Sequence, residues 1–498
     1  MEPLPPRKGL SGSGVDRRRD MTARRQAEQL GGGDPQRALA YIEANFESHL
    51  ADLQGYLKVD NLVTHRERCD EMARRLKEEI ERLGGRASVL DYGDMPFVYG
   101  RLESGAPRTL VIYRNYDIVP PEGADWSAPP FSGRVRRLEG LGDCVIARGA
   151  CDPKGPLVGT LRAIEALVRA EGGSPVNLIF LLEGDEQLGS PTLAKVIHDR
   201  RKELETAQGA LYPKFIQGQG GDPVLPLGVK GMLLLELICS GGAWGGPTRT
   251  SIHSGNAAWV ASPAWRMVRA LATLLDENER VLVNGFYDDV VEIIRPEKED
   301  GGSPEPHVGV IEDQYEYLRS RHVLRFKHDL PPAAICKRYL GQPTFNLANL
   351  LIHRSRPWSQ FLLPCEVRAQ VDIRLVPDQD PEAVVAAIRH HLNDHGFQDI
   401  EVITRLAYRP WSIEEDHPLV ETARRAYRRS GKEPEVHPSS GTSQPFSLFD
   451  EIGLPLVVAG LGRGGRSFHT SEYASIAGIQ EFEKWVVRFV HEFAGPGR

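Results

Sequence analysis

The sequence has few cysteines and no long apolar run. Its 498 residues include six cysteines, none of them arranged as Cys-x-x-Cys. We therefore expect neither a disulfide framework nor a thiolate zinc site, and we expect a reducing, cytoplasmic location. The apolar runs, such as residues 176–182, are far too short to cross a bilayer, and no charged-then-apolar signal peptide opens the chain. No membrane partner is expected.

Excess positive charge is also lacking. The chain carries 61 Lys and Arg against 68 Asp and Glu, which gives a formal net charge of −7. A nucleic-acid-binding protein would carry a basic surface, so no nucleic-acid partner is expected. With 41% hydrophobic residues the chain can form hydrophobic cores, and its length predicts two or more domains.

Strand and helix patterns alternate along most of the chain. Residues 1–35 are rich in Gly, Pro and Arg, so we expect a disordered tail there. The following segments include an apolar strand at 109–115 and a helix at 155–173 that stops at a Gly-Gly pair. This β-α-β rhythm predicts an α/β domain with a mainly parallel sheet.

The pattern changes between residues 232 and 408. The segment CEVRAQVDIRLVP alternates polar and apolar residues, as strands of an antiparallel sheet do. The α/β pattern then returns after Trp411. We therefore expect 36–231 and 409–498 to form one α/β domain, with 232–408 inserted into it as an α+β domain.

Four polar clusters follow the predicted strands. Alone, each has an ordinary interpretation: Asp152 would cap a helix, and His469 would be structural. Together they place carboxylates and a histidine where ligands bind in open α/β sheets, so metal or acid–base chemistry is expected. The clusters are Asn115–Asp117, Arg148–Gly155, Glu183–Ser190 and the segment with His469 and Glu472.

The order of these motifs resembles the dinuclear-zinc amidohydrolases of metallopeptidase family twenty, which include aminoacylases, carnosinase-type dipeptidases and succinyl-diaminopimelate desuccinylase. The resemblance covers nearly the whole chain after residue 35. The motifs that carry it are NYDIVPPEGADWSAPPF, RGACDPKG, EGDEQLGS, GVKG, HSG, IRLVP, the turn Gly441–Ser443 and the segment His469–Glu472.

This resemblance implies a fold and a reaction. The fold is a zinc-peptidase-like α/β catalytic domain with a mainly parallel mixed sheet, plus an inserted α+β lid that forms a homodimer. The reaction is hydrolysis of the amide bond of a small carboxylate-bearing substrate, a dipeptide or an N-acyl amino acid.

The resemblance also implies roles for individual residues. Asp152 matches a carboxylate that bridges two metals, and Glu186 matches the general base that deprotonates metal-bound water. Asp117 matches an acid that orients the preceding ligand. His469 matches a terminal metal ligand, and His253 matches a lid histidine that polarises the scissile carbonyl of a partner subunit's site.

Substrate contacts are implied as well. Arg374 matches the lid arginine that grips a substrate carboxylate, a task that suits its bidentate fork. Gly441 and Thr442 belong to the turn that contacts the substrate.

The sequence departs from the family at three metal-ligand positions. Asn115 stands where a histidine is implied, Gln187 stands where a glutamate is implied, and Pro213 or Lys214 stands where an acid is implied. Neutral amides bind hard divalent metals poorly. We therefore expect one divalent metal, with zinc favoured, or none, and a two-metal site is doubtful. The candidate ligands are Asp152, Gln187, His469 and Asn115.

Two alternatives to a metallo-amidohydrolase stay open. A metal-poor enzyme of the same fold could use Glu186 for non-hydrolytic chemistry, with Lys214 offsetting the charge of Asp152. A non-catalytic binding protein is the other alternative. Metal content would separate the hydrolase from both.

Overall fold

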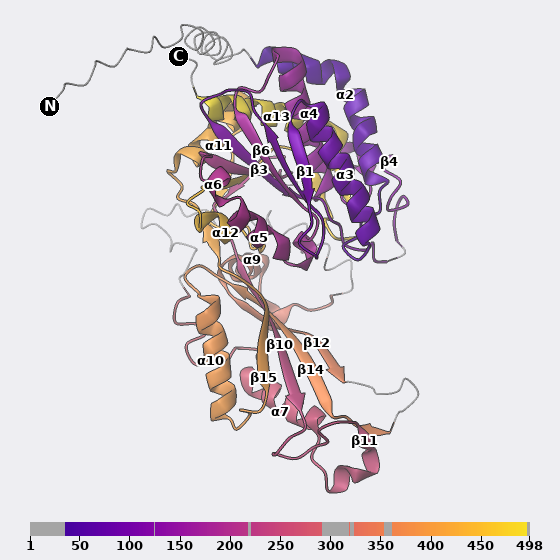
Figure 1. Cartoon of the computed structure of the whole chain (residues 1–498), viewed down its shortest axis with the longest axis vertical. Helices are drawn as coiled ribbons and strands as arrows, with labels where there is room; N and C mark the ends of the chain where they lie inside the picture. Colours follow the sequence, from indigo (N-terminus) through magenta and orange to yellow (C-terminus); the bar gives the residue numbers. More distant parts are fainter. Residues whose placement is uncertain are drawn as a thin grey trace, which may run out of the picture.

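The computed structural model describes residues 35–123, 125–217, 221–290, 318, 323–352 and 361–495. The predicted tail, residues 1–35, lies outside the described residues except for Pro35. Figure 1 shows two lobes, an α/β lobe that contains both described ends of the chain and a narrower lobe built on a second sheet. Within the described residues, no helix is both long enough and apolar enough to cross a membrane.

A six-stranded sheet forms the centre of the α/β lobe. Its order is β1 (Arg86–Leu90), β2 (Phe97–Leu102), β6 (Asn177–Glu183), β3 (Thr109–Asn115), β7 (Gly209–Pro213) and β18 (Leu456–Ala459). β3 is parallel to both β6 and β7, and β7 is parallel to β18. β1 and β2 are antiparallel at one edge. The expected α/β class with a mainly parallel mixed sheet is confirmed.

Both faces of this sheet are buried because its central strands are apolar on both sides. Along β3, Leu110 and Ile112 face one core, and Val111 and Tyr113 face another. The helices of the first core are α2 (Gln36–Leu57), α3 (Arg66–Arg82), α4 (Lys154–Glu171), α11 (Pro418–Arg429) and α13 (Ile476–Ala494). The helices of the second are α5 (Pro191–Asp199), α6 (Arg201–Leu204) and α12 (Ser447–Asp450).

Short strands connect distant segments around this lobe. The α/β lobe also contains a smaller sheet of four strands, with the order β19 (Gly464–Gly465), β20 (Tyr473–Ser475), β5 (Gly142–Ile146) and β4 (Arg134–Leu138). It joins the C-terminal segment to the strand that leads into the Asp152 loop. Two-stranded pairs join β8 (Val224–Pro226) to β17 (Glu435–His437) and β9 (Gly228–Val229) to β16 (Trp411–Ser412).

The second lobe, called the lid below, is built on an antiparallel sheet. The order is β12 (Thr344–Ile352), β14 (Glu366–Leu375), β10 (Gly231–Ser240) and β15 (Glu401–Tyr408). Every second residue of β14 is buried, beneath α7 (Pro263–Leu274) and α10 (Pro381–Asp394). Two more elements are α9 (Pro332–Gly341) and the pair β11 (Ile252–His253) with β13 (Leu362–Leu363). The division of the chain at residues 231 and 409 stays a prediction.

Candidate active site

Parallel strands bring several of the predicted site residues together at the carboxyl ends of β3 and β6. β3 and β6 end in register, with Asn115 opposite Glu183. The chain beyond each strand carries Asp117 and Glu186, and the backbone N–H of Gln187 donates to Asp117 Oδ2 at 2.9 Å. Segments about 70 residues apart in the chain therefore meet where the fold class predicts a ligand site.

Amide groups surround the carboxyl of Glu186. Asn115 Nδ2 donates to Glu186 Oε2 at 3.2 Å and to Asp117 Oδ1 at 3.1 Å. Gln187 Nε2 also donates to Glu186 Oε2, and Gln444 Nε2 donates to Glu186 Oε1 at 3.0 Å. The oxygen of the Asn115 amide accepts from the Tyr212 hydroxyl at 3.3 Å. The two amides at predicted metal-ligand positions thus turn their nitrogens toward Glu186.

Burial and neighbouring acids change the protonation of this cluster. Burial is the main cause that raises the pKa of Glu186 to about 8, and the charges of Asp117 and Asp152 raise it further. Burial likewise raises the pKa of Asp117 to about 7, against the hydrogen bonds that it accepts from Gln187 and Asn115. A carboxyl group with a pKa near neutrality can both take and give a proton, as general acid–base chemistry requires.

Asp152 lies in a different environment, between two cations. Its Oδ1 pairs with Arg114 Nη2, and its Oδ2 lies 3.3 Å from Lys214 Nζ. Burial by itself would raise the pKa of Asp152, but the charges of Arg114 and Lys214 outweigh burial and lower it below the ordinary value. Asp152 is therefore ionised at neutral pH.

The two cations lie at the carboxyl ends of two adjacent strands. Arg114 is the penultimate residue of β3, and Lys214 directly follows β7, which is parallel to β3. The Arg114 side chain has no exposed surface, and its guanidinium carbon lies 4.4 Å from the centre of the Tyr212 ring. Lys214 keeps 24% of its side chain exposed.

The C-terminal segment is attached to the Asp152 loop through Glu472. The carboxylate of Glu472 accepts from the backbone N–H groups of Gly149, Cys151 and Asp152 at 2.9 to 3.0 Å. It also pairs with the buried Arg148 at 2.9 Å. His469, three residues earlier, is half-buried, and its carbonyl oxygen accepts from Arg148 Nη1 at 3.3 Å. The predicted ligand His469 therefore lies on a segment that the Asp152 loop holds in place.

The predicted substrate contacts lie where the lid meets the α/β lobe. Arg374 on β14 forms an ion pair with Asp372 at 3.4 Å. On the neighbouring strand β10 it lies opposite Met232, which follows Lys230 by two residues. The backbone N–H of Lys230 donates to the Thr442 carbonyl at 2.7 Å. Gly441 has a φ of +70° and lies directly against the Tyr339 ring of α9, where a larger residue would clash.

Tyr408 on β15 links these contacts to Glu186. Burial is the main cause that raises its pKa; the Glu186 charge adds to the rise, and the Arg374 charge opposes it. Both charges are therefore close enough to act on one buried phenol.

His253 lies apart from this centre. It belongs to β11, which Figure 1 shows at the far end of the lid from the α/β lobe, and it is exposed. Its Nδ1 accepts from the backbone N–H of Gly255 at 3.1 Å. Within one chain, the predicted catalytic histidine is not brought to Glu186.

Sequence reasoning missed two members of the centre, Arg114 and Gln444. The signal for Arg114 was a charged residue inside the apolar strand LVIYRN, since such a residue is buried only with a partner. Gln444 carried no local signal, because its contact with Glu186 spans 258 residues of chain.

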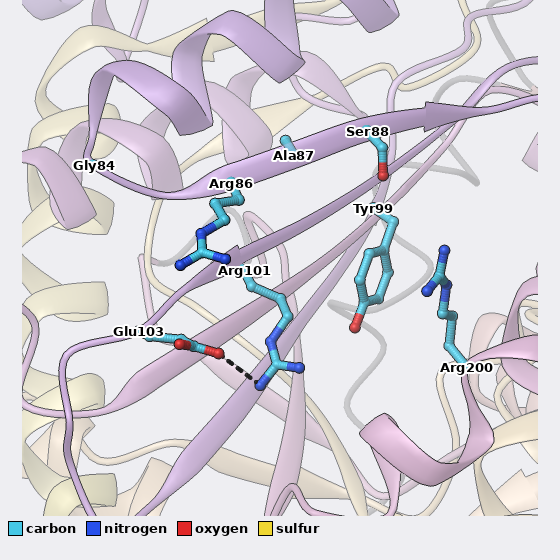
Figure 2. A pocket seen from close by; sticks show the side chains of 8 residues that line it. All are labelled: Gly84, Arg86, Ala87, Ser88, Tyr99, Arg101, Glu103 and Arg200. Atoms are coloured by element: carbon cyan, nitrogen blue, oxygen red, sulfur yellow. Dashed lines mark ion pairs between the residues drawn. The ribbon is translucent and has the colours of Figure 1, made fainter.

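A cavity of about 450 Å³ lies elsewhere, at the β1 side of the sheet. Figure 2 shows Arg86 and Arg101 of this cavity, which belong to the edge strand β1 and its neighbour β2, with Arg101 paired to Glu103 at 3.0 Å. Arg101 also pairs with Glu203 at 3.0 Å, as does Arg200 at 3.1 Å. These two arginines already have counter-ions, and the cavity contains none of the predicted site residues.

Comparisons with known proteins agree with the motifs. Human Beta-Ala-His dipeptidase is 24% identical over 398 residues, which cover 75% of this chain and 75% of that protein. Cys-Gly metallodipeptidase of Schizosaccharomyces pombe is 25% identical over 459 residues, which cover 87% of this chain and 92% of that protein.

Solved structures share the fold. An M20 family metallo-carboxypeptidase from Sulfolobus solfataricus has a TM-score of 0.75 at 29% identity, covering 90% of this chain and 99% of that one. Human carnosine dipeptidase 1 has a TM-score of 0.71 at 22% identity, covering 93% and 100%. Residues 111–492 match Peptidase family M20/M25/M40. As the order of its motifs predicts, the chain belongs to this peptidase family and is a hydrolase by class.

Proposed function

We propose that this protein hydrolyses the amide bond of a small substrate with a free carboxylate, a dipeptide or an N-acyl amino acid. The observation that carries the proposal is Glu186, a carboxyl group just beyond the end of β6 that accepts hydrogen bonds from Asn115 and Gln444 and whose pKa burial raises to about 8. The names of the relatives support it, because both curated proteins described above are dipeptidases.

The proposed roles follow from the contacts. Arg374 would hold the substrate carboxylate, with the turn of Gly441 and Thr442 beside it. Glu186 would take a proton from the attacking water and return it to the leaving amine. Asp117 would position both Asn115 and Gln187 through the hydrogen bonds that it accepts.

The family implies a divalent metal, and we propose that this centre holds at most one. Zinc is the metal that the family resemblance favours, and one relative is named as a metallodipeptidase. The candidate ligands are Asp152, Gln187, His469 and Asn115, of which two are neutral amides. No step of the proposed reaction is assigned to a metal.

A homodimer through the lid is the proposed assembly. β12 forms an edge of the lid sheet, and an edge strand offers unpaired backbone groups to another chain. Its side chains Leu347, Leu350, Leu351 and Ile352 are 38% to 51% exposed. Such a dimer could bring the exposed His253 to the partner's site. Light scattering that finds a monomer at micromolar concentration would exclude this assembly.

The proposed location is cytoplasmic. All six cysteines lie in the described part of the chain, and all six are free thiols. Free thiols persist in reducing compartments.

The test is a hydrolysis assay of the full-length chain against a panel of dipeptides and N-acetyl amino acids. Glu186→Gln keeps the shape of the side chain but cannot accept the proton, so we expect kcat to fall about 100- to 10,000-fold. The matched control is Glu401→Gln, at an exposed position of β15, which should leave kcat unchanged. Equal kcat values for Glu186→Gln and the native chain would exclude Glu186 as the base.

Ligand binding without hydrolysis is the second candidate. It is favoured because both acids already have partners within the chain. Asp152 pairs with two cations, and Glu186 accepts hydrogen bonds from three side-chain amides. Calorimetric binding of a dipeptide that the protein does not cleave would support this candidate over the first.

A further inference from the structure

We infer that the centre of this site is metal-free, and that the guanidinium of Arg114 and the ammonium of Lys214 supply the positive charge that divalent metals supply in its metallo-relatives. The inference rests on the proposed function only in placing the centre at Asp152. It does not depend on whether the protein cleaves its ligand.

The first argument is that both carboxylate oxygens of Asp152 already have cationic partners. Each of its oxygens already faces a cation, Arg114 on Oδ1 and Lys214 on Oδ2. A metal bound to Asp152 would therefore lie beside two positive charges. Because Asp152 and Arg114 are buried, little water reaches this point to screen the repulsion.

The second argument is that Arg114 is fixed in place. Its side chain is fully buried on β3, with Tyr212 against its guanidinium. A buried guanidinium cannot lose its proton or move into water to make room for a metal. Lys214 is partly exposed and could move away, so Arg114 is the stronger barrier.

The third argument is the donor set. Metals of this class bind anionic oxygen, imidazole or thiolate. At the two amide positions, Asn115 and Gln187 direct N–H groups toward Glu186, and an N–H group cannot coordinate a cation. Among the described residues, no group of three or more His, Cys, Asp or Glu side chains is placed to hold a metal ion.

The residues present therefore do not fit the dinuclear site that the family implies. They fit a site in which side chains of the protein itself, Arg114 and Lys214, neutralise the charge of Asp152. A carboxylate as buried as Asp152 needs a positive partner, and two side chains provide it here.

The test measures metal content and thermal stability of the full-length chain. The protein is saturated with Zn²⁺, dialysed into metal-free buffer and analysed by mass spectrometry, and its Tm is recorded with Zn²⁺ and with EDTA. We expect substoichiometric zinc and the same Tm in both. One tightly held equivalent of zinc, or a Tm that EDTA lowers, would overturn the inference.

Two variants separate the role of the cations from that of the amides. Asn115→His with Gln187→Glu restores ligands but keeps both cations, so we expect it to stay metal-free. Adding Arg114→Ala and Lys214→Glu should give a chain that retains about one equivalent of zinc. Zinc retained by the double variant, or a folded quadruple variant without zinc, would show that the cations do not exclude the metal.

These outcomes are independent of the hydrolysis assay. A metal-free native chain that cleaves dipeptides supports both proposals, and a metal-free chain that cleaves none leaves the inference standing while the proposed reaction fails. Should the quadruple variant not fold, the native metal content and Tm still decide the question.

Discussion

Asp152, which is buried, and Glu186, which is half-buried, lie near the carboxyl ends of β3 and β6, and their pKa values shift in opposite directions. Cations neutralise Asp152, and its pKa falls below the ordinary value. Amides surround Glu186, and its pKa rises to about 8. Burial opposes the charge of both groups, so the difference comes from their partners: a full positive charge outweighs the cost of burial, and neutral donors do not.

This comparison assigns separate tasks to the two groups. An acid that stays ionised between fixed cations can hold charge but cannot move protons near neutral pH. An acid that titrates near neutrality can move protons. Single substitutions test the comparison first, beginning with the one of larger expected effect, and the pH dependence of stability tests it last.

Removing the buried cation of Asp152 should have the largest effect. Arg114→Met keeps much of the side-chain volume but leaves Asp152 with the partly exposed Lys214 alone. We expect the free energy of unfolding to fall by about 3 to 5 kcal/mol, the range for breaking a buried ion pair. Urea denaturation followed by circular dichroism measures the change.

The matched control is Arg137→Met, which breaks an exposed pair with Asp143 and should cost less than about 1 kcal/mol. Adding Asp152→Asn to Arg114→Met should recover part of the loss, because the uncompensated charge is then gone. If Arg114→Met were no more destabilising than Arg137→Met, Arg114 would not be the main counter-ion of Asp152.

The same comparison shows how far sequence reasoning reached. The β-α-β rhythm predicts the mixed sheet because strands such as β3 are apolar on both faces, which is a local property. The substitutions at Asn115 and Gln187 are visible because both lie inside recognisable motifs. The partners of Asp152 and Glu186 are not local: Arg114 is 38 residues from Asp152, and Gln444 is 258 residues from Glu186.

The lid shows another limit of the sequence. The alternation of β14 predicts an antiparallel strand, and the structure has one. The segment 280–345 carries no readable motif, yet its helix α9 places Tyr339 against Gly441. Such a contact depends on how the two lobes pack together, and the sequence pattern within each lobe does not specify that packing.

Removing one amide from Glu186 should have a smaller effect than removing the cation from Asp152. Gln444→Met deletes the donor to Oε1 and leaves Asn115 and Gln187 on Oε2. We expect a loss of about 0.5 to 1.5 kcal/mol in the free energy of unfolding, the net value of one neutral hydrogen bond. The same urea titration measures it, and a loss as large as that of Arg114→Met would contradict the distinction between the two acids.

The last expected effect is spread over several pH units: it is the slope of the free energy of unfolding with pH. The unfolded chain releases the Glu186 proton near pH 4.5, whereas the folded chain keeps it until about pH 8. Unfolding therefore releases a proton between these values, so Glu186 makes the free energy of unfolding fall as pH rises through this interval. Asp152, with its lowered pKa, is ionised in both states across the interval and adds no slope there.

Glu186→Gln should remove this contribution and flatten the fall, while Glu401→Gln should leave the slope of the native chain unchanged. Asp117 titrates in the same interval with a pKa of about 7, and its charge acts on Glu186, so the difference between variants measures Glu186 together with its effect on Asp117. Urea midpoints measured from about pH 5 to 8 give the slopes. If Glu186→Gln and the native chain have parallel slopes, the proton is not held at Glu186, and amides would then be stabilising its ionised form much as cations stabilise Asp152.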